Sequence, residues 1–148
     1  RGAEIKKWQS IRLGIAGVSM RYPRNWRIQN NVKNSIIREG EDAIATLDIL
    51  DAKALGESML AYRVAKLSSL KDLGYDILSV QETVIDGENA LVLNFQEPGG
   101  AGNTYETVFL YGGSFYVVTL LIKKEHVKNE EEIIINEYKN MLAAIQLP

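Results

Sequence analysis

The sequence predicts an α+β domain, with a largely antiparallel sheet flanked by two main helices. Two observations lead to this class. Apolar residues alternate along several short segments separated by turn residues, as in strands joined by hairpins. Two other segments repeat apolar residues every three or four positions, as amphipathic helices do. Because 148 residues suit one domain, we expect residues 1–16 to form an N-terminal lead-in and first strand and residues 17–148 to form a single domain.

Short strands are predicted in the N-terminal third of the chain. Apolar residues alternate over residues 11–15 and again over residues 18–22, and Gly17 between them predicts a turn or bulge. Pro23 ends the second strand, because proline lacks the N–H group that a strand ladder requires. Two further strands are predicted at residues 35–38 and 43–50.

Residues 57–73 are predicted to form the first helix. The apolar stripe expected to face the sheet consists of Leu60, Val64, Leu67 and either Leu70 or Lys71. The charged residues expected on the opposite side are Arg63, Lys66 and Asp72. Gly74 follows directly after Leu73, in the position where glycine commonly ends a helix with a left-handed backbone.

Four strands and a closing helix follow. Asp86-Gly87 and Gly112-Gly113 are short turn sequences, so consecutive hairpins are expected to form an antiparallel meander. Asn129, with Glu132 three positions later, predicts the N-cap of a helix over residues 129–145. The four strands are predicted at residues 76–85, 90–95, 104–111 and 115–122. The apolar stripe of the last helix consists of Ile134, Tyr138, Met141, Leu142 and Ile145.

Composition argues against several classes of protein. The chain has no cysteine, which excludes disulfides, thiolate metal sites and a cysteine nucleophile. Its net charge is -2 and its only adjacent lysine pairs are at residues 6–7 and 123–124, so nucleic-acid binding is disfavoured. No apolar run reaches the roughly 20 residues of a membrane span. Because the sequence begins at Arg1, we expect a processed form or a piece of a longer protein, and a signal peptide or lipid anchor upstream is compatible with it.

Few residues are candidates for chemistry, and each has a plainer interpretation. His126 is the only histidine and lies in a polar connection, so a solvated loop residue is favoured over a catalytic one. The glycine-rich loop at residues 98–102 leads into a predicted strand and lacks the lysine of a phosphate-binding loop, so a hairpin connection is favoured. The acidic residues Glu39, Glu41 and Asp42 are expected in a solvated turn, and a cation site there is left open.

Aromatic side chains also have two interpretations. Tyr105, Phe109 and Tyr111 share one face of a predicted strand, where core packing is favoured over ligand stacking. Core packing is favoured for Trp26 as well. No serine lies in the context of a nucleophile elbow. We therefore assign no catalytic, cofactor-binding or metal-binding residue, and we expect no cofactor.

The order of motifs along the chain is similar to that of a known family. Residues 17–26 read GVSMRYPRNW, with a glycine, an alternating strand, an aromatic–proline pair and a tryptophan. A helix ending at Gly74-Tyr75, the hairpin turn at residues 86–87, the turn at residues 111–113 and a closing helix with MLAAI at residues 141–145 follow. From Gly17 onward, the chain resembles the PsbP-like family.

The resemblance implies an α/β/α sandwich around an antiparallel sheet. The family includes a photosystem II extrinsic protein, bacterial envelope lipoproteins and a nuclear Ran-binding protein, which bind partners and share no catalytic motif. Photosystem members dock through a basic surface, whereas this chain has a net charge of -2 and no clustered lysine patch. A bacterial, extracytoplasmic member, secreted or lipid-anchored, is therefore the better match.

The expected function is that of a non-enzymatic accessory or binding domain of the bacterial cell envelope, acting through contacts with an unknown protein partner. The alternative is a small-molecule or metal-ion binding protein that uses a cleft between sheet and helix. A hydrolase ranks third, because it lacks a set of catalytic residues. Contacts are expected in the loops at residues 29–34, 39–42 and 98–103.

Overall fold

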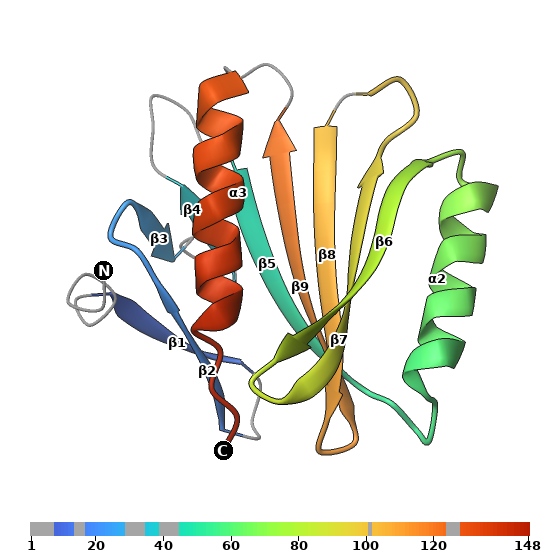
Figure 1. Ribbon diagram of the computed structural model, residues 1–148, viewed down its shortest axis with the longest axis horizontal. Helices are drawn as coiled ribbons and strands as arrows, with labels where there is room; N and C mark the ends of the chain where they lie inside the picture. The colour runs from blue at the N-terminus through green and yellow to red at the C-terminus, as the bar shows by residue number, and fades with distance from the viewer. Residues whose placement is uncertain (1–7, 14–16, 29–34, 39–44, 101, 124–127) are drawn as a thin grey trace.

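The computed structural model describes residues 8–13, 17–28, 35–38, 45–100, 102–123 and 128–148, and it contains two helices and nine strands within them (Figure 1). The helices are α2 (Met59–Asp72) and α3 (Lys128–Ala143). The strands are β1 (Gln9–Leu13), β2 (Val18–Tyr22), β3 (Trp26–Ile28), β4 (Ser35–Arg38), β5 (Ala45–Lys53), β6 (Asp76–Ile85), β7 (Glu88–Gln96), β8 (Gly102–Tyr111) and β9 (Ser114–Lys123).

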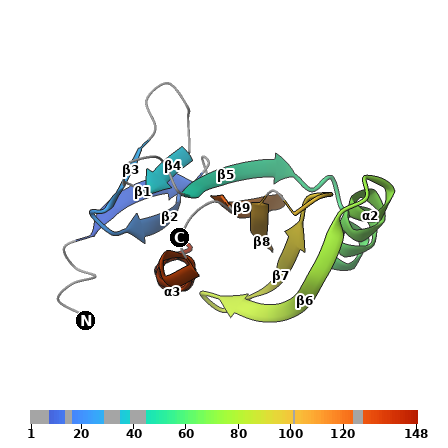
Figure 2. The same ribbon diagram turned by 90° about the horizontal axis from the view of Figure 1, so that it is seen from above.

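The strands form one large sheet and one hairpin. Seven of them pair antiparallel in the order β3-β4-β5-β9-β8-β7-β6, and β1 and β2 pair separately, also antiparallel. The large sheet is curved, with α3 and the β1–β2 hairpin on its concave side and α2 on the other side (Figure 2). The predicted α+β class, a largely antiparallel sheet flanked by two main helices, is therefore confirmed.

Two tight turns at one end of the sheet set the register of its longest strands. Asp86 (φ 45°) and Gly87 (φ 88°) both have left-handed backbone, as a two-residue hairpin turn with the twist of its strands requires. Gly112 (φ 58°) and Gly113 (φ 77°) do the same between β8 and β9. All ten residues of β8 then pair in sequence with the ten of β9. Both hairpins lie where the sequence predicts them.

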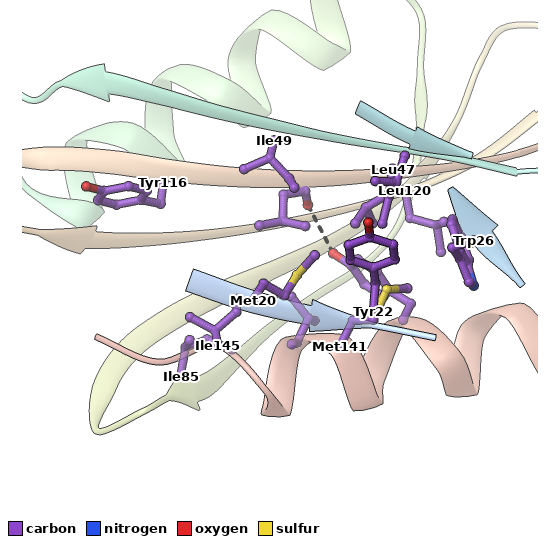
Figure 3. Close-up of a cluster of buried hydrophobic side chains, with 14 of the residues drawn as sticks. Met20, Tyr22, Trp26, Leu47, Ile49, Ile85, Tyr116, Leu120, Met141 and Ile145 are labelled. Atoms are coloured by element: carbon purple, nitrogen blue, oxygen red, sulfur yellow. Dashed lines mark hydrogen bonds between the residues drawn. The ribbon is translucent and has the colours of Figure 1, made fainter. Parts of the chain in front are cut away.

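The central strands are buried on both faces. Along β9, Tyr116, Val118 and Leu120 belong to the apolar cluster on the α3 side, whereas Phe115 and Val117 pack on the α2 side. The α3-side cluster is the larger one and joins the sheet, α3 and β2 (Figure 3). Both helices are therefore needed to keep this sheet away from water.

Aromatic residues fill the α3-side cluster, as the sequence predicts. Trp26 is fully buried there. Phe109 stacks on Tyr116 with ring centroids 5.3 Å apart and planes 13° from parallel. Tyr105 and Tyr111 are partly buried and pack against the same cluster. The core role predicted for Trp26 and for the aromatic face of β8 is thus confirmed.

The β1–β2 hairpin completes the cover beside α3. Along β2, Val18, Met20 and Tyr22 are buried, whereas the alternate residues are partly exposed. Ser19 exchanges two backbone hydrogen bonds with Gln146, of 3.0 and 2.8 Å, which join the hairpin to the segment after α3. The two ends of the described chain therefore support each other.

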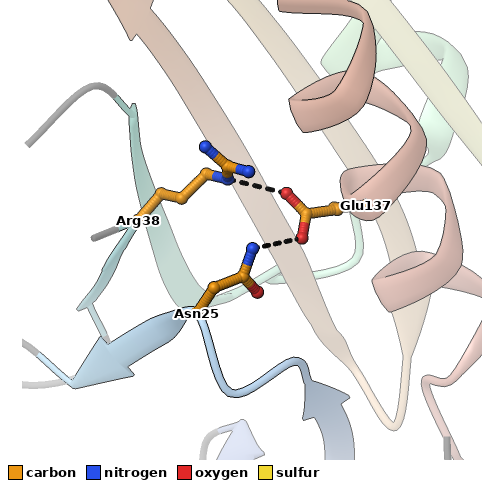
Figure 4. Close-up of polar contacts among 3 residues, drawn as sticks. All are labelled: Asn25, Arg38 and Glu137. Carbon is orange, nitrogen blue, oxygen red and sulfur yellow. Dashed lines mark hydrogen bonds and ion pairs between the residues drawn. The ribbon is translucent and has the colours of Figure 1, made fainter. Parts of the chain in front are cut away.

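One carboxylate on α3 holds the β3–β4 edge of the sheet against that helix (Figure 4). Asn25 Nδ2 donates to Glu137 Oε2 at 2.7 Å, and Arg38 Nε donates to Glu137 Oε1 at 2.7 Å. The Arg38–Glu137 pair is only slightly exposed to water. Charge-assisted bonds of this kind are shorter and stronger than neutral ones, so Glu137 fixes the distance between α3 and this edge.

The helix ends differ slightly from the prediction. α2 begins at Met59 after the N-cap Ser58, whose hydroxyl oxygen accepts a 3.1 Å hydrogen bond from the Ala61 amide. α3 begins at Lys128, so Asn129 lies within the first turn and is not the N-cap. The backbone at Lys128 is already helical. A capping pattern in the sequence fixes the start of a helix only to within one or two residues, which accounts for the difference.

Among the described residues, neither helix combines the length and the apolarity that crossing a bilayer requires.

Candidate functional site

A row of polar side chains lies on the concave face of the outermost strands. The register between β6 and β7 shifts between Ile77 and Ser79, which leaves Leu78 without a partner. After this bulge, the alternation places Ser79, Gln81 and Thr83 on the α3 side of the sheet. Hydroxyl and amide groups therefore replace the apolar residues that face α3 from the central strands.

These residues line a cleft of about 500 Å³ between α3 and the β6–β8 part of the sheet. Val92, Asn94 and Tyr105 contribute to it from β7 and β8. The residues that line it from α3 are Ile135, Tyr138, Lys139, Leu142 and Ala143. The cleft has the size of many small-molecule sites, one wall of it is largely apolar, and its floor carries neutral polar groups.

Tyr138 forms the rigid inner side of the cleft. Its hydroxyl donates to the carbonyl oxygen of Val118 at 3.0 Å, so the hydroxyl of Thr107, 2.5 Å away, donates to Tyr138. Burial raises the pKa of Tyr138 well above its usual 10.0, which keeps the phenol protonated. Tyr138 therefore acts as a structural hydrogen-bonding group and does not supply a base.

Tyr105 connects the cleft to the start of α3. Its ring lies 6.3 Å from that of Tyr138. Burial raises the pKa of Tyr105, and hydrogen bonds from Asn103 and Asn94 oppose this rise. Asn103 Nδ2 also donates to Glu131 Oε1 at 3.0 Å. The side-chain oxygens of Asn94 and Asn103 are buried, and neither has a hydrogen-bond partner among the described residues. Of the two residues, Asn94 lines the cleft, and its unpaired acceptor favours a ligand that brings N–H or O–H donors.

A second feature is the way α2 packs on the opposite side of the sheet. Glu106 of β8 is buried there, accepts a 2.9 Å hydrogen bond from the Tyr62 hydroxyl, and lies 3.0 Å from Lys66 Nζ. The Lys66 ammonium also sits 5.8 Å from the centre of the Phe95 ring. Burial and the neighbouring Glu106 raise the pKa of Tyr62. A buried carboxylate requires such partners, because an unpaired charge is costly in the interior.

This packing corrects the stripe predicted for the first helix. Leu67 and Leu70 face the sheet as predicted. Leu60 and Val64 do not, since 69% and 62% of their surfaces are exposed. Lys66, predicted on the outer side, points inward to Glu106. The helix is rotated because the ion pair and residues such as Met59 and Tyr62 occupy the inner side.

The rotation leaves an apolar surface on the outside of the molecule, which we call the α2 outer face. It consists of Leu60 and Val64, which are four positions apart on the helix and both exposed. Leu55, in the turn before α2, is 87% exposed, and Leu73, at the C-cap of α2, is 63% exposed. Leu55 has φ 53°, a left-handed conformation that leucine rarely adopts. Such strain persists only where the surrounding structure imposes it, and it is commonest at functional positions. The α2 outer face is thus a second candidate site.

The candidates named from sequence have different outcomes. His126 and the acidic residues Glu39, Glu41 and Asp42 lie outside the described residues, as do the loops at 29–34 and 39–42. The glycine-rich loop leads into β8, a strand, as predicted. Within the ranges that the structure describes, no three histidine, cysteine, aspartate or glutamate side chains come together as metal ligands would.

A cleft between sheet and helix was the alternative read from sequence, and Tyr105, weighed there as a ligand-stacking residue, lines it. The polar cleft residues of β6 and β7 and the α2 outer face were missed by sequence reasoning. One signal was present, because Asn94 interrupts an otherwise apolar strand between Leu93 and Phe95. A polar residue at an inward-facing position of a buried strand indicates a partner or a cavity. The bulge at Leu78 and the rotation of α2 had no local signal in the sequence.

Comparisons with known proteins support the fold. No protein-family model and no curated protein matches the chain. The solution structure of cyanobacterial PsbP (CyanoP) from a Synechocystis species is similar, with 12% identity, a TM-score of 0.62 and coverage of 100% of this chain and 96% of that one.

Two other solved structures have different described roles. LpqN, involved in cell envelope biogenesis of Mycobacterium tuberculosis, has 14% identity and a TM-score of 0.66 over 97% of this chain and 95% of its own. The Ran-binding protein Mog1p of Saccharomyces cerevisiae has 10% identity and a TM-score of 0.57 over 95% of each chain. The chain therefore has the Mog1/PsbP-like α/β/α fold. At these identities the likeness establishes the fold alone, because folds of this kind serve unrelated functions.

We predict that Tyr138→Phe lowers the free energy of unfolding at pH 7 by about 1–3 kcal/mol, because the carbonyl of Val118 and the hydroxyl of Thr107 lose a buried partner. Urea denaturation followed by fluorescence measures this change.

The raised pKa of Tyr138 also makes stability depend on pH. The buried neutral phenol stabilises the folded state fully below pH 10.0, and this stabilisation is lost as the pH rises towards the folded-state pKa. The variant should therefore lose less stability than the parent above pH 10.0. Equal alkaline losses in both proteins would contradict the burial of this phenol.

Proposed function

We propose that this chain is a non-enzymatic binding domain of the bacterial cell envelope, located outside the cytoplasm, that acts through contacts with a partner protein. The observation that carries the proposal is the α2 outer face, where Leu60 and Val64 are both more than half exposed, together with the exposed Leu55 in the turn before the helix. Single exposed apolar residues are ordinary, but a group on one helix and the turn before it indicates an interaction surface. The role of LpqN in envelope biogenesis supports the compartment.

The arrangement of this face suggests the chemistry of its partner. Leu60 and Val64 are four residues apart, so they lie side by side on the helix and form one ridge. Charged residues of both signs, including Glu57 and Lys71, are exposed close by in the sequence. A partner with an apolar helix or groove fits such a ridge better than a strongly charged partner does.

The cleft supports binding over turnover. Its floor consists of hydroxyl and amide groups, and Lys139 and Glu82 are its charged lining residues. The phenol of Tyr138 is held protonated by burial. These groups hold and orient a molecule through hydrogen bonds, and they do not form the nucleophile–base pair that covalent catalysis requires.

We predict that Leu60→Ser combined with Val64→Ser abolishes partner binding while the free energy of unfolding changes by no more than about 1 kcal/mol, since both side chains are exposed. Ile133→Ser is the matched control, because Ile133 is 49% exposed on α3, on the other side of the sheet. A photo-crosslinking amino acid at position 64, or at position 133, is irradiated in envelope extract of the source cells. One discrete adduct is expected from position 64 and none from position 133.

Two results would count against this proposal. One is equal crosslinking from both positions. The other is reproducible turnover in a broad hydrolase screen that a single carboxylate or serine substitution abolishes, with no adduct recovered from position 64.

The second candidate function is binding of a small molecule in the cleft between sheet and helix. The unpaired oxygen of Asn94 and the polar row on β6 favour it. A ligand with N–H or O–H donors and an apolar side fits the two walls. A metal-ion form of this function would need residues outside the described ranges, because the described residues hold no cluster of ligands.

A thermal-shift screen with a blocked variant tests this second function. Ser79→Trp fills the cleft, whereas Leu78→Trp places the same side chain at an exposed neighbouring position. A specific ligand at 100 times its Kd should stabilise the parent and Leu78→Trp by about 2.7 kcal/mol and leave Ser79→Trp unchanged. Stabilisation of all three proteins would place the ligand elsewhere.

A further inference from the structure

The charge of the chain is divided very unevenly along the sequence. The first 38 residues carry nine lysines and arginines and one acidic residue, a formal charge of +8. The remaining 110 residues carry eight lysines and arginines and 18 acidic residues, a formal charge of −10, and the two parts give the net -2. Six of the seven arginines lie in the first part. The small net charge is therefore the sum of a strongly basic N-terminal part of the sequence and a strongly acidic remainder.

The β1–β2 hairpin gathers part of this basic charge on one face. Arg12 pairs with Ser19 and Arg21 pairs with Ser10, so the two arginines are diagonal neighbours on the same face of the hairpin. That face points away from the core, because the alternate residues of β2 are the buried ones. Arg24 is exposed in the turn that follows β2. We call Arg12, Arg21 and Arg24 the hairpin arginines.

The hairpin arginines have no acidic partner in the part of the chain that the structure describes. By contrast, Arg38 is paired with Glu137 and Lys66 with Glu106. Beside Arg21 lies a shallow hollow of about 240 Å³, whose other lining residues are Asn140, Ala143, Ala144 and Gln146, all uncharged. Arg21 lines this hollow, and Arg12 lies diagonally beside Arg21 on the same face of the hairpin. With the exposed Arg24, these guanidinium groups offer forked donors to phosphate or carboxylate oxygens.

The surface fits a fluid anionic layer better than it fits a folded partner or a nucleic acid. Protein contacts depend on buried anchors such as tryptophan and tyrosine, but the nearby Tyr22 and Trp26 are already in the core. Single-stranded nucleic acids need exposed aromatic rings for stacking. The acidic remainder of the chain would repel any polyanion long enough to reach it. A bilayer touches one face only, and its headgroups can move to meet each arginine.

We propose that the β1–β2 hairpin docks on the surface of an anionic phospholipid bilayer through Arg12, Arg21 and Arg24. The hairpin lies at one end of the long axis of the molecule and α2 lies at the other (Figures 1 and 2). Docking through the hairpin therefore leaves the α2 outer face free in water. This inference rests on charge and is independent of the partner proposed for α2.

Co-sedimentation with vesicles tests the inference. One set of vesicles contains about one third phosphatidylglycerol in phosphatidylcholine, and the other contains phosphatidylcholine alone. The probe variant is Arg12→Gln/Arg21→Gln/Arg24→Gln. The control is Lys53→Gln/Lys71→Gln/Lys123→Gln, which removes three exposed charges from β5, α2 and β9. Circular dichroism and thermal melting establish that both variants fold like the parent.

The parent should bind the anionic vesicles, and binding should fall steeply as salt rises from about 50 to about 500 mM. Each cation near an anionic membrane raises partitioning about fivefold, so the hairpin variant should lose roughly a hundredfold. The control should lose no more than a few-fold.

Three results would overturn the inference. They are equal binding to neutral vesicles, an equal loss in both variants, and retention of the parent on polyglutamate or RNA without binding to vesicles. The last of these would point to an acidic protein or a nucleic acid as the partner.

Discussion

The structure depends on one constraint, which is that the central strands of its sheet are apolar on both faces. In β9, side chains of the α3-side cluster alternate with side chains of the α2-side cluster. A sheet of this kind is stable only when both faces are covered. One helix and the β1–β2 hairpin cover the concave face, and α2 covers the other. The cleft, the α2 outer face and the exposed hairpin face all lie at the margins of these covers, where burial is incomplete.

Two buried or partly buried glutamates then determine how the helices are oriented on the sheet. Glu106 is buried under α2, and its need for partners draws Tyr62 and Lys66 inward and turns two apolar residues of the same helix outward. Glu137 has the corresponding effect on the other side, where it holds Asn25 and Arg38 against α3. Charged residues thus set the rotation and position of both helices, although apolar burial supplies most of the driving force for folding.

Much of the fold could be predicted from the sequence, because the signals are local. The turns at Asp86-Gly87 and Gly112-Gly113, the period-two strands and the final helix follow from short-range chemistry. The orientation of α2 could not be predicted, because the partner that decides it, Glu106, is 40 residues away from Lys66 in the sequence. The cleft depends on a bulge at Leu78, and the hairpin arginines become one group only when β1 pairs with β2. Counting adjacent lysines overlooks that group, because its members are arginines spread along the chain.

Under the two proposals above, the molecule has two ends with different partners, a basic hairpin for an anionic surface and an apolar helix face for a protein. The absence of cysteine allows a clean test with one label at a time. An environment-sensitive dye is attached through Ser10→Cys on the hairpin or Val64→Cys on α2, and quenching by a water-soluble quencher is measured with anionic vesicles. We expect the vesicles to protect the dye at position 10 and to leave the dye at position 64 fully quenched. Protection at position 64, or equal quenching at both positions while the protein is vesicle-bound, would contradict this expectation.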